Sequence, residues 1–159
     1  MKISNIQVNH MDKPMGFNLS SLRIDFKIED TNETNLKKQL IISSNDQVVY
    51  DSNLITYNNN YFNVPLNLEP RKHYDVKVIV SGKEKAEGTT FFETGKINEK
   101  WTAKWIANKN KDLQNTLFKK KFSVKDSVKS AHLYITGLGL YEAYLNDQKI
   151  GNEYLTPGS

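Results

Sequence analysis

The sequence predicts an all-β protein built from two consecutive β-sandwich domains. Leu22–Ile28 alternates strictly between apolar and polar residues, which is the period of a half-buried strand. The first ninety-odd residues contain about seven short apolar runs, spaced by roughly 8–12 residues and separated by polar turns, as is typical of a sandwich. No segment carries an apolar stripe of helical period.

Length and composition limit the classes of protein to which this sequence can belong. A length of 159 residues allows one large domain or two small ones. Only 38% of residues are hydrophobic, but eight Tyr and seven Phe add large buried area to a thin core. The net charge of +4 is spread among acidic residues, so we expect no nucleic-acid partner. The absence of Cys excludes disulfides and cysteine-based metal sites.

Neither a metal, a cofactor nor a membrane is expected as a partner. The three histidines, His10, His73 and His132, are too far apart in sequence to suggest metal ligands. The N-terminus lacks the apolar stretch of a signal peptide, and no run approaches the ~20 apolar residues of a membrane span. A cytoplasmic bacterial location is therefore the simplest expectation.

The first domain is predicted to be a chain of short strands. Pro14–Gly16 is expected to be a turn, and Pro65 marks an edge strand or a strand end because proline donates no ladder hydrogen bond. Phe91 and Phe92 should point to opposite faces of their strand. The predicted strands are 3–8, 22–28, 39–43, 48–50, 61–66, 75–80 and 88–94.

The element Leu68-x-Pro70-x-x-x-Tyr74 resembles the signature of fibronectin type III domains. The resemblance implies an immunoglobulin/fibronectin III-like β-sandwich in which Tyr74 forms a tyrosine corner. Phe26 is the nearest candidate for the tryptophan that the family carries on its second strand. The polar stretch Gly95–Lys100 then predicts a linker, which places the first domain at residues 1–96 and the second at 97–159.

The second domain is also predicted to be built of strands, at 117–124, 131–136, 140–145 and 148–150. Asn146-Asp147 is a two-residue hairpin signal between the last two. Phe118, Phe122 and Val124 should share one face of the first of these strands. Lys119 and Lys121 then lie on its other face, which is exposed to solvent.

Trp101, Trp105 and Tyr141 are the weak candidates for substrate binding. Trp101 and Trp105 share a face in an extended or a helical chain, and aromatic rings of this kind can stack on a sugar. The alternative, which we favour, is that they anchor their segment against a neighbouring domain. No catalytic residue and no metal ligand is assigned. Glu142, the acidic residue next to Tyr141, is interpreted as an ordinary strand-face residue.

The second half of the sequence carries a more specific resemblance. The order of its motifs is similar to that of the N-terminal β-sandwich domain of bacterial α-L-rhamnosidases, glycoside hydrolase family 78. These motifs are Trp101-Thr-Ala-Lys-Trp105-Ile106, Phe118-Lys-Lys-Lys-Phe122, the run from Ala131 to Asn146, Ile150-Gly151 and Leu155-x-Pro157-Gly158.

This resemblance implies a non-catalytic N-terminal region of an enzyme that hydrolyses terminal α-L-rhamnosides with inversion. Such an enzyme needs two carboxyl groups ~6.5–9.5 Å apart, and in the family these lie in a downstream (α/α)6 barrel. The fragment alone is therefore expected to be inactive, with the downstream domains as its partners. The alternatives are a free-standing carbohydrate-binding module and an interaction module.

The second domain is expected to be an incomplete jelly-roll-like β-sandwich. A jelly roll needs about eight strands, whereas residues 101–159 supply roughly four. Unpaired strand edges invite pairing with another chain. We therefore expect self-association through exposed strand edges.

Overall fold

The computed structural model describes residues 1–109, 115–125, 127–128 and 131–152. Backbone contacts divide the chain into two units, Met1–Ile106 and Ala107–Ser159, which are described separately. The described residues form strands and no helix, so none of them could cross a membrane as a helix. The all-β prediction is confirmed, while the predicted boundary at residues 96 and 97 stays a prediction.

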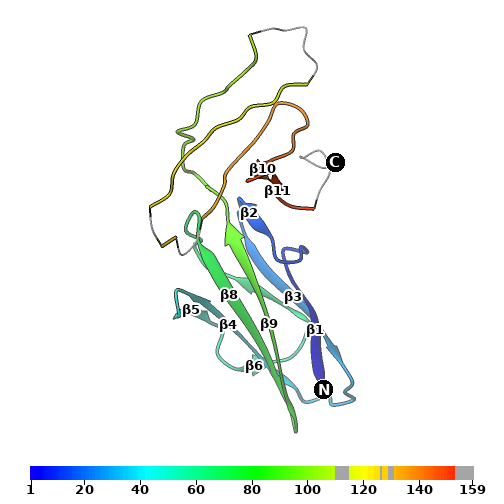
Figure 1. The fold of residues 1–159 in the computed structure, drawn as a ribbon. Coiled ribbons are helices and arrows are strands. Elements are labelled where there is room, and N and C mark those ends of the chain that lie inside the picture. Colours follow the sequence, from blue (N-terminus) through cyan, green and yellow to red (C-terminus); the bar gives the residue numbers. More distant parts are fainter. Residues whose placement is uncertain (110–114, 126, 129–130, 153–159) are drawn as a thin grey trace. The chain divides into compact units, whose positions relative to one another are not determined.

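Two sheets form the first unit (Figure 1). The smaller sheet has the order β1-β3-β7, and the larger has the order β2-β9-β8-β4-β5 with β6 also paired to β4. All pairings are antiparallel except that of β2 with β9. The strands are β1 (Lys2–Val8), β2 (Met15–Phe17), β3 (Leu22–Glu29), β4 (Lys37–Ser44), β5 (Gln47–Asp51), β6 (Ile55–Thr56), β7 (Tyr61–Val64), β8 (His73–Ser81) and β9 (Lys85–Thr94).

The core follows the alternation in the sequence, because alternate side chains of a strand point to the same face. On β3, Leu22, Ile24 and Phe26 are all buried and face the other sheet. The larger sheet adds Leu40, Ile42, Val76, Val78, Val80 and Phe92. The ring of Phe26 stacks on that of Phe62, with centroids 5.8 Å apart, so Phe26 fills the centre of the sandwich as expected.

The seven predicted strands of this unit are all present, and β7 ends at Val64, before Pro65. Two short strands were missed. The turn predicted at Pro14–Gly16 is wrong, because Met15–Phe17 forms a strand that runs parallel to the end of β9. There the Glu93 amide donates to the Pro14 carbonyl at 2.9 Å. β6 was not predicted either, since two residues carry no periodic signal.

Tyr74 closes one corner of the sandwich, and its predicted structural role is confirmed. Its hydroxyl accepts a hydrogen bond from the Glu69 amide at 2.9 Å, five residues upstream, while its ring stacks on Phe92 at 4.9 Å. Phe92 is fully buried, whereas Phe91 is half-buried and stacks on His73, so the two phenylalanines do point to opposite faces.

The predicted linker is held against the first unit. The Gly95 carbonyl accepts from the Arg71 amide at 2.9 Å, and the Gly95 amide donates to the Phe17 carbonyl at 2.8 Å. A Cβ at Gly95 would collide with the carbonyl oxygen of Gly16. Further along, the Arg71 guanidinium makes two contacts with the Glu99 carboxylate, at 2.7 and 2.9 Å. These bonds fix the direction in which the chain leaves β9.

Within the described part of the second unit, only β10 (Tyr144–Leu145) and β11 (Gln148–Lys149) form. They pair across Asn146 and Asp147, both with positive φ, which confirms the hairpin. The strands predicted at 117–124 and 131–136 are wrong: no ladder forms there, and side chains such as Leu117 (88% exposed) are open to solvent. Alternation alone does not make a strand without a partner for its backbone groups. Leu155-x-Pro157-Gly158 lies outside the described residues.

Lys38 is a buried charge that the sequence did not reveal. Its side chain on β4 is only 2% exposed. Its ammonium group donates to the Asn59 carbonyl at 3.0 Å, the Asn59 side-chain oxygen at 2.6 Å and the Tyr61 carbonyl at 2.7 Å. It also lies 4.5 Å from the centroid of the Phe62 ring. Burial lowers the pKa of Lys38. This lysine ties the Asn58–Asn60 loop to the core.

Replacing Lys38 with Met should lower the free energy of unfolding by about 2 kcal/mol, because three oxygens lose a charged donor. Urea denaturation measures the change. The control is Lys37→Met at the exposed neighbouring position, which should cost less than about 0.5 kcal/mol. Equal effects at the two positions would contradict the role of Lys38 in holding the loop.

Candidate functional site

Trp101 and Trp105 lie in the first unit, beyond β9, and are 49% and 67% exposed. The Lys96 ammonium group lies 5.5 Å from the centroid of the Trp101 ring. The ring contacts among the described residues do not include one between the two tryptophans. They are therefore available to a partner, but the structure does not join them into one platform.

Tyr141 belongs to the second unit. Its hydroxyl donates to the Ile135 carbonyl at 3.3 Å, and its ring lies against Gly137, where a Cβ would come within 2.8 Å of a ring carbon. The missing side chain of Gly137 thus makes room for the tyrosine. Local packing accounts for Tyr141.

Glu142 is held by its neighbours on the hairpin. It accepts from the Tyr144 hydroxyl at 2.7 Å and from the Lys149 ammonium at 2.9 Å. The hydrogen bond to Glu142 raises the pKa of Tyr144. Glu142 is therefore a paired carboxylate, but its predicted place on a strand is wrong, because of the strand predicted at 140–145 only Tyr144–Leu145 forms.

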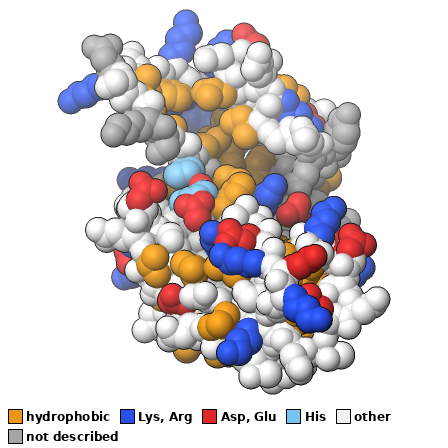
Figure 2. All heavy atoms as spheres, turned by 90° about the horizontal axis from the view of Figure 1, so that it is seen from below, with side chains coloured by type: hydrophobic (Ala, Val, Ile, Leu, Met, Phe, Trp, Pro, Cys, Tyr) orange, Lys and Arg blue, Asp and Glu red, His pale blue; other side chains and the backbone are white. Residues whose placement is uncertain are grey.

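Several carboxylates of the first unit are also paired with cations. Figure 2 shows acidic and basic side chains interspersed on one face of the molecule. Glu87 lies 2.6 Å from both Lys77 and Lys85, and these hydrogen bonds lower its pKa to about 2. A general acid in glycoside hydrolysis needs a raised pKa, so Glu87 has the opposite character. Within the described ranges, no three acidic or histidine side chains gather in a way that could hold a metal ion.

His73 on β8 lies between two carboxylates. Its two nitrogens lie 3.0 Å from Glu93 and 3.2 Å from Asp75, and its ring stacks on Phe91 at 5.2 Å. Burial lowers the pKa of His73, but the hydrogen bonds to Glu93 and Asp75 outweigh that effect and raise it above 6.5. The ring therefore bridges two carboxylates, which stabilise its imidazolium form.

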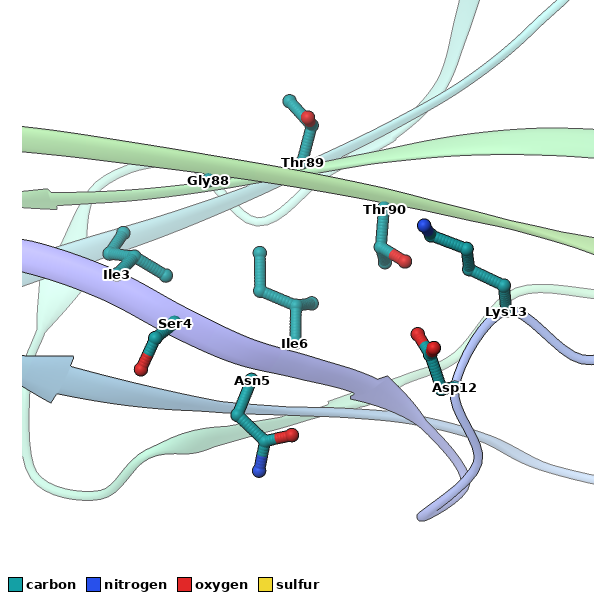
Figure 3. A pocket seen from close by; sticks show the side chains of 9 residues that line it. All are labelled: Ile3, Ser4, Asn5, Ile6, Asp12, Lys13, Gly88, Thr89 and Thr90. Carbon is teal, nitrogen blue, oxygen red and sulfur yellow. The ribbon is translucent and has the colours of Figure 1, made fainter.

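A pocket of about 400 Å³ opens between β1 and β9 (Figure 3). Ile3 and Ile6 line it from β1, and Thr90 lines it from β9. Asp12 and Lys13 line it from the loop after β1. Its remaining lining residues are Ser4, Asn5, Gly88 and Thr89. Sequence reasoning missed this pocket because it joins segments about eighty residues apart.

Comparisons with known proteins agree with this architecture. The family model described as Rha78A-like, N-terminal immunoglobulin domain, matches residues 3–98. The model described as Alpha-L-rhamnosidase N-terminal domain matches residues 126–159. The solved structure of alpha-L-rhamnosidase from Dictyoglumus thermophilum is 26% identical with a TM-score of 0.56, over 67% of this chain and 14% of that chain. No curated protein matched.

The fold defines an immunoglobulin-like β-sandwich module, after which the chain continues into a second β-rich segment. Because the first family model spans more than half of the chain, the chain belongs to the Rha78A-like N-terminal immunoglobulin domain family. The second match confirms the resemblance to α-L-rhamnosidases and makes this an N-terminal part of a protein of that family.

The His73 bridge should make stability depend on pH. Because the folded-state pKa is raised above 6.5, its contribution is fully present below the unfolded pKa and is lost as pH rises through the folded pKa. His73→Gln should therefore destabilise the protein more at about pH 5.5 than at about pH 8. Urea unfolding of both proteins at the two pH values measures the difference. A pH-independent difference would show that the bridge does not bind the extra proton.

Proposed function

We propose that this chain is the non-catalytic N-terminal region of an α-L-rhamnosidase and serves as a scaffold for the domains that carry the chemistry. The observation that supports the proposal is the order of the two family matches, an immunoglobulin-like domain and then the rhamnosidase N-terminal domain, along one chain. The chain covers only 14% of the solved rhamnosidase. The activity therefore belongs, in this proposal, to the downstream domains, which are the partners of this region in a cytoplasmic bacterial enzyme.

A scaffold role suits the physical character of the first unit. Its apolar residues form a continuous core, and several of its surface charges are paired with one another. The segment from Gly95 to Glu99 is fastened to the sandwich by hydrogen bonds and the Arg71–Glu99 ion pair. A rigid domain with a fixed exit can orient the domain that comes after it.

The scaffold proposal predicts how the parent enzyme responds to loss of its first domain. Removal of residues 1–96 from the enzyme that contains this chain should lower its melting temperature, because a scaffold stabilises the domains that it supports. The turnover number on an aryl α-L-rhamnoside should change by less than about tenfold, since no catalytic group is removed. The 159-residue chain alone should release no rhamnose. Hydrolysis by the isolated chain, or an unchanged melting temperature without the domain, would refute the proposal.

A carbohydrate-binding module is the second candidate function, and the exposure of Trp101 and Trp105 favours it. Aromatic rings at the surface can stack on sugar rings. In that case calorimetric titration with rhamnose oligosaccharides should give saturable heats, which Trp101→Ala, Trp105→Ala or Tyr141→Ala would abolish. A scaffold without a sugar site gives no saturable heat at all.

Self-association through the second unit is a further expectation of the proposal. Large apolar side chains there remain open to solvent, including Leu117 at 88% and Leu138 at 89%. Segments that expose both apolar side chains and unpaired backbone groups pair readily with another copy. Light scattering of the 159-residue chain should show a mass that rises with concentration, and Phe118→Lys with Phe122→Lys should suppress the rise. A strictly monomeric chain at high concentration would contradict this.

A further inference from the structure

The pocket lies between β1 of the smaller sheet and β9 of the larger sheet. β1 carries a bulge between Ser4 and Gln7, where Asn5 adopts a positive φ of 47°. Asparagine tolerates this conformation better than most residues. The bulge turns Ile6 toward β9, where Gly88 leaves room for it: a Cβ on Gly88 would lie 2.7 Å from the Ile6 Cδ1 atom. The hollow is therefore a consequence of the backbone and not of a loose side chain.

The Thr90 hydroxyl is the atom of the pocket that most clearly indicates a missing partner. The residue is only 8% exposed, and its hydroxyl has no hydrogen-bond partner among the described residues. Figure 3 shows its side chain directed into the pocket, while that of the adjacent Thr89 points the other way. An unpaired buried hydroxyl costs free energy, and native structures contain few of them. A partner that enters the pocket would supply the missing hydrogen bond.

The other walls indicate what kind of partner fits. Asp12 and Lys13 bring one negative and one positive charge, so the lining has no net charge and favours neither an anion nor a cation. Ile3 and Ile6 offer an apolar wall opposite. The hydroxyl groups of a ligand can donate a hydrogen bond to the Asp12 carboxylate and accept one from the Lys13 ammonium group. With the Thr90 hydroxyl they can do either. Sites of 300–1,000 Å³ are typical of small-molecule pockets, and this one is about 400 Å³.

We propose that the β1–β9 pocket binds a neutral polyhydroxylated ligand of the size of one sugar ring, with the Thr90 hydroxyl as its innermost hydrogen-bond partner. The hydroxyl has almost no contact with solvent in the free protein. Entry therefore requires the flexible Lys13 side chain to swing aside, after which its ammonium group and the Asp12 carboxylate hold the outer hydroxyls. Trp101 and Trp105 are not among the lining residues of this pocket, and the proposal stands whether or not the chain acts as a scaffold.

The test is a titration of the 15N-labelled 159-residue chain, monitored by amide shifts, with L-rhamnose, D-glucose, glycerol and L-alanine as separate probes. A sugar should shift the amides of Asp12, Lys13 and residues 88–90 saturably. Thr90→Val removes the hydroxyl but keeps the shape, and should weaken sugar binding about tenfold, as expected for the loss of one hydrogen bond. Thr89→Val is the matched control and should bind as the wild type does. Asp12→Ala, on an exposed loop, should also weaken binding.

The melting temperature of the free Thr90→Val protein provides a second readout. With no partner to lose, the variant should be at least as stable as the wild type. The absence of saturable shifts with either sugar overturns the proposal, and a destabilised Thr90→Val protein would then identify a resident water as the partner. Saturable shifts with glycerol of equal affinity, or with L-alanine alone, overturn the assignment to a sugar-sized polyol. Binding that survives Thr90→Val but disappears with Trp101→Ala places the sugar elsewhere and likewise overturns it.

Discussion

The backbone ladder around β8 is the interaction on which the rest of the structure depends. β8 pairs with β9 over the whole run from His73 to Ser81, and with β4 from Asp75 to Ser81. Its alternating residues supply the centre of the core, since Val76, Val78 and Val80 are all buried. The same strand carries Tyr74 to the corner and His73 to the two carboxylates. It also aligns β9, whose Gly88 and Thr90 form the wall of the pocket.

How much could be predicted from the sequence differed between the two halves for a physical reason. Leu22–Ile28 alternates and has partners on both sides, so its pattern was sufficient. Residues 117–124 alternate less strictly, because Lys120 has the parity of Phe118 and Phe122, and no neighbouring strand satisfies their backbone groups within the described chain. Lys38 has the parity of Leu40 and Ile42, which was the available signal for its burial. Its charge nevertheless suggested a solvated position, and only the Asn59 and Tyr61 oxygens explain why it is inside.

The candidate sites could also be predicted only in part from the sequence. Trp101, Trp105 and Tyr141 could be found in the sequence because aromatic residues are conspicuous, but their exposure and contacts depend on neighbours that the sequence does not reveal. The pocket depends on a bulge at Asn5, an absent side chain at Gly88 and an unpaired hydroxyl at Thr90. None of these is a motif. Its parts come together only when the first strand of the sandwich lies beside the last.

The bonds at Gly95 restrict the motion of the chain where it leaves the first unit. The Gly95 amide and carbonyl are both bonded to the sandwich, and Arg71 grips Glu99 four residues further on. A chain bonded at two successive points has less freedom to bend or twist there, so residues 95–99 should move together with the sandwich. The segment that composition predicted to be a linker is therefore, over residues 95–99, an extension of the sandwich itself.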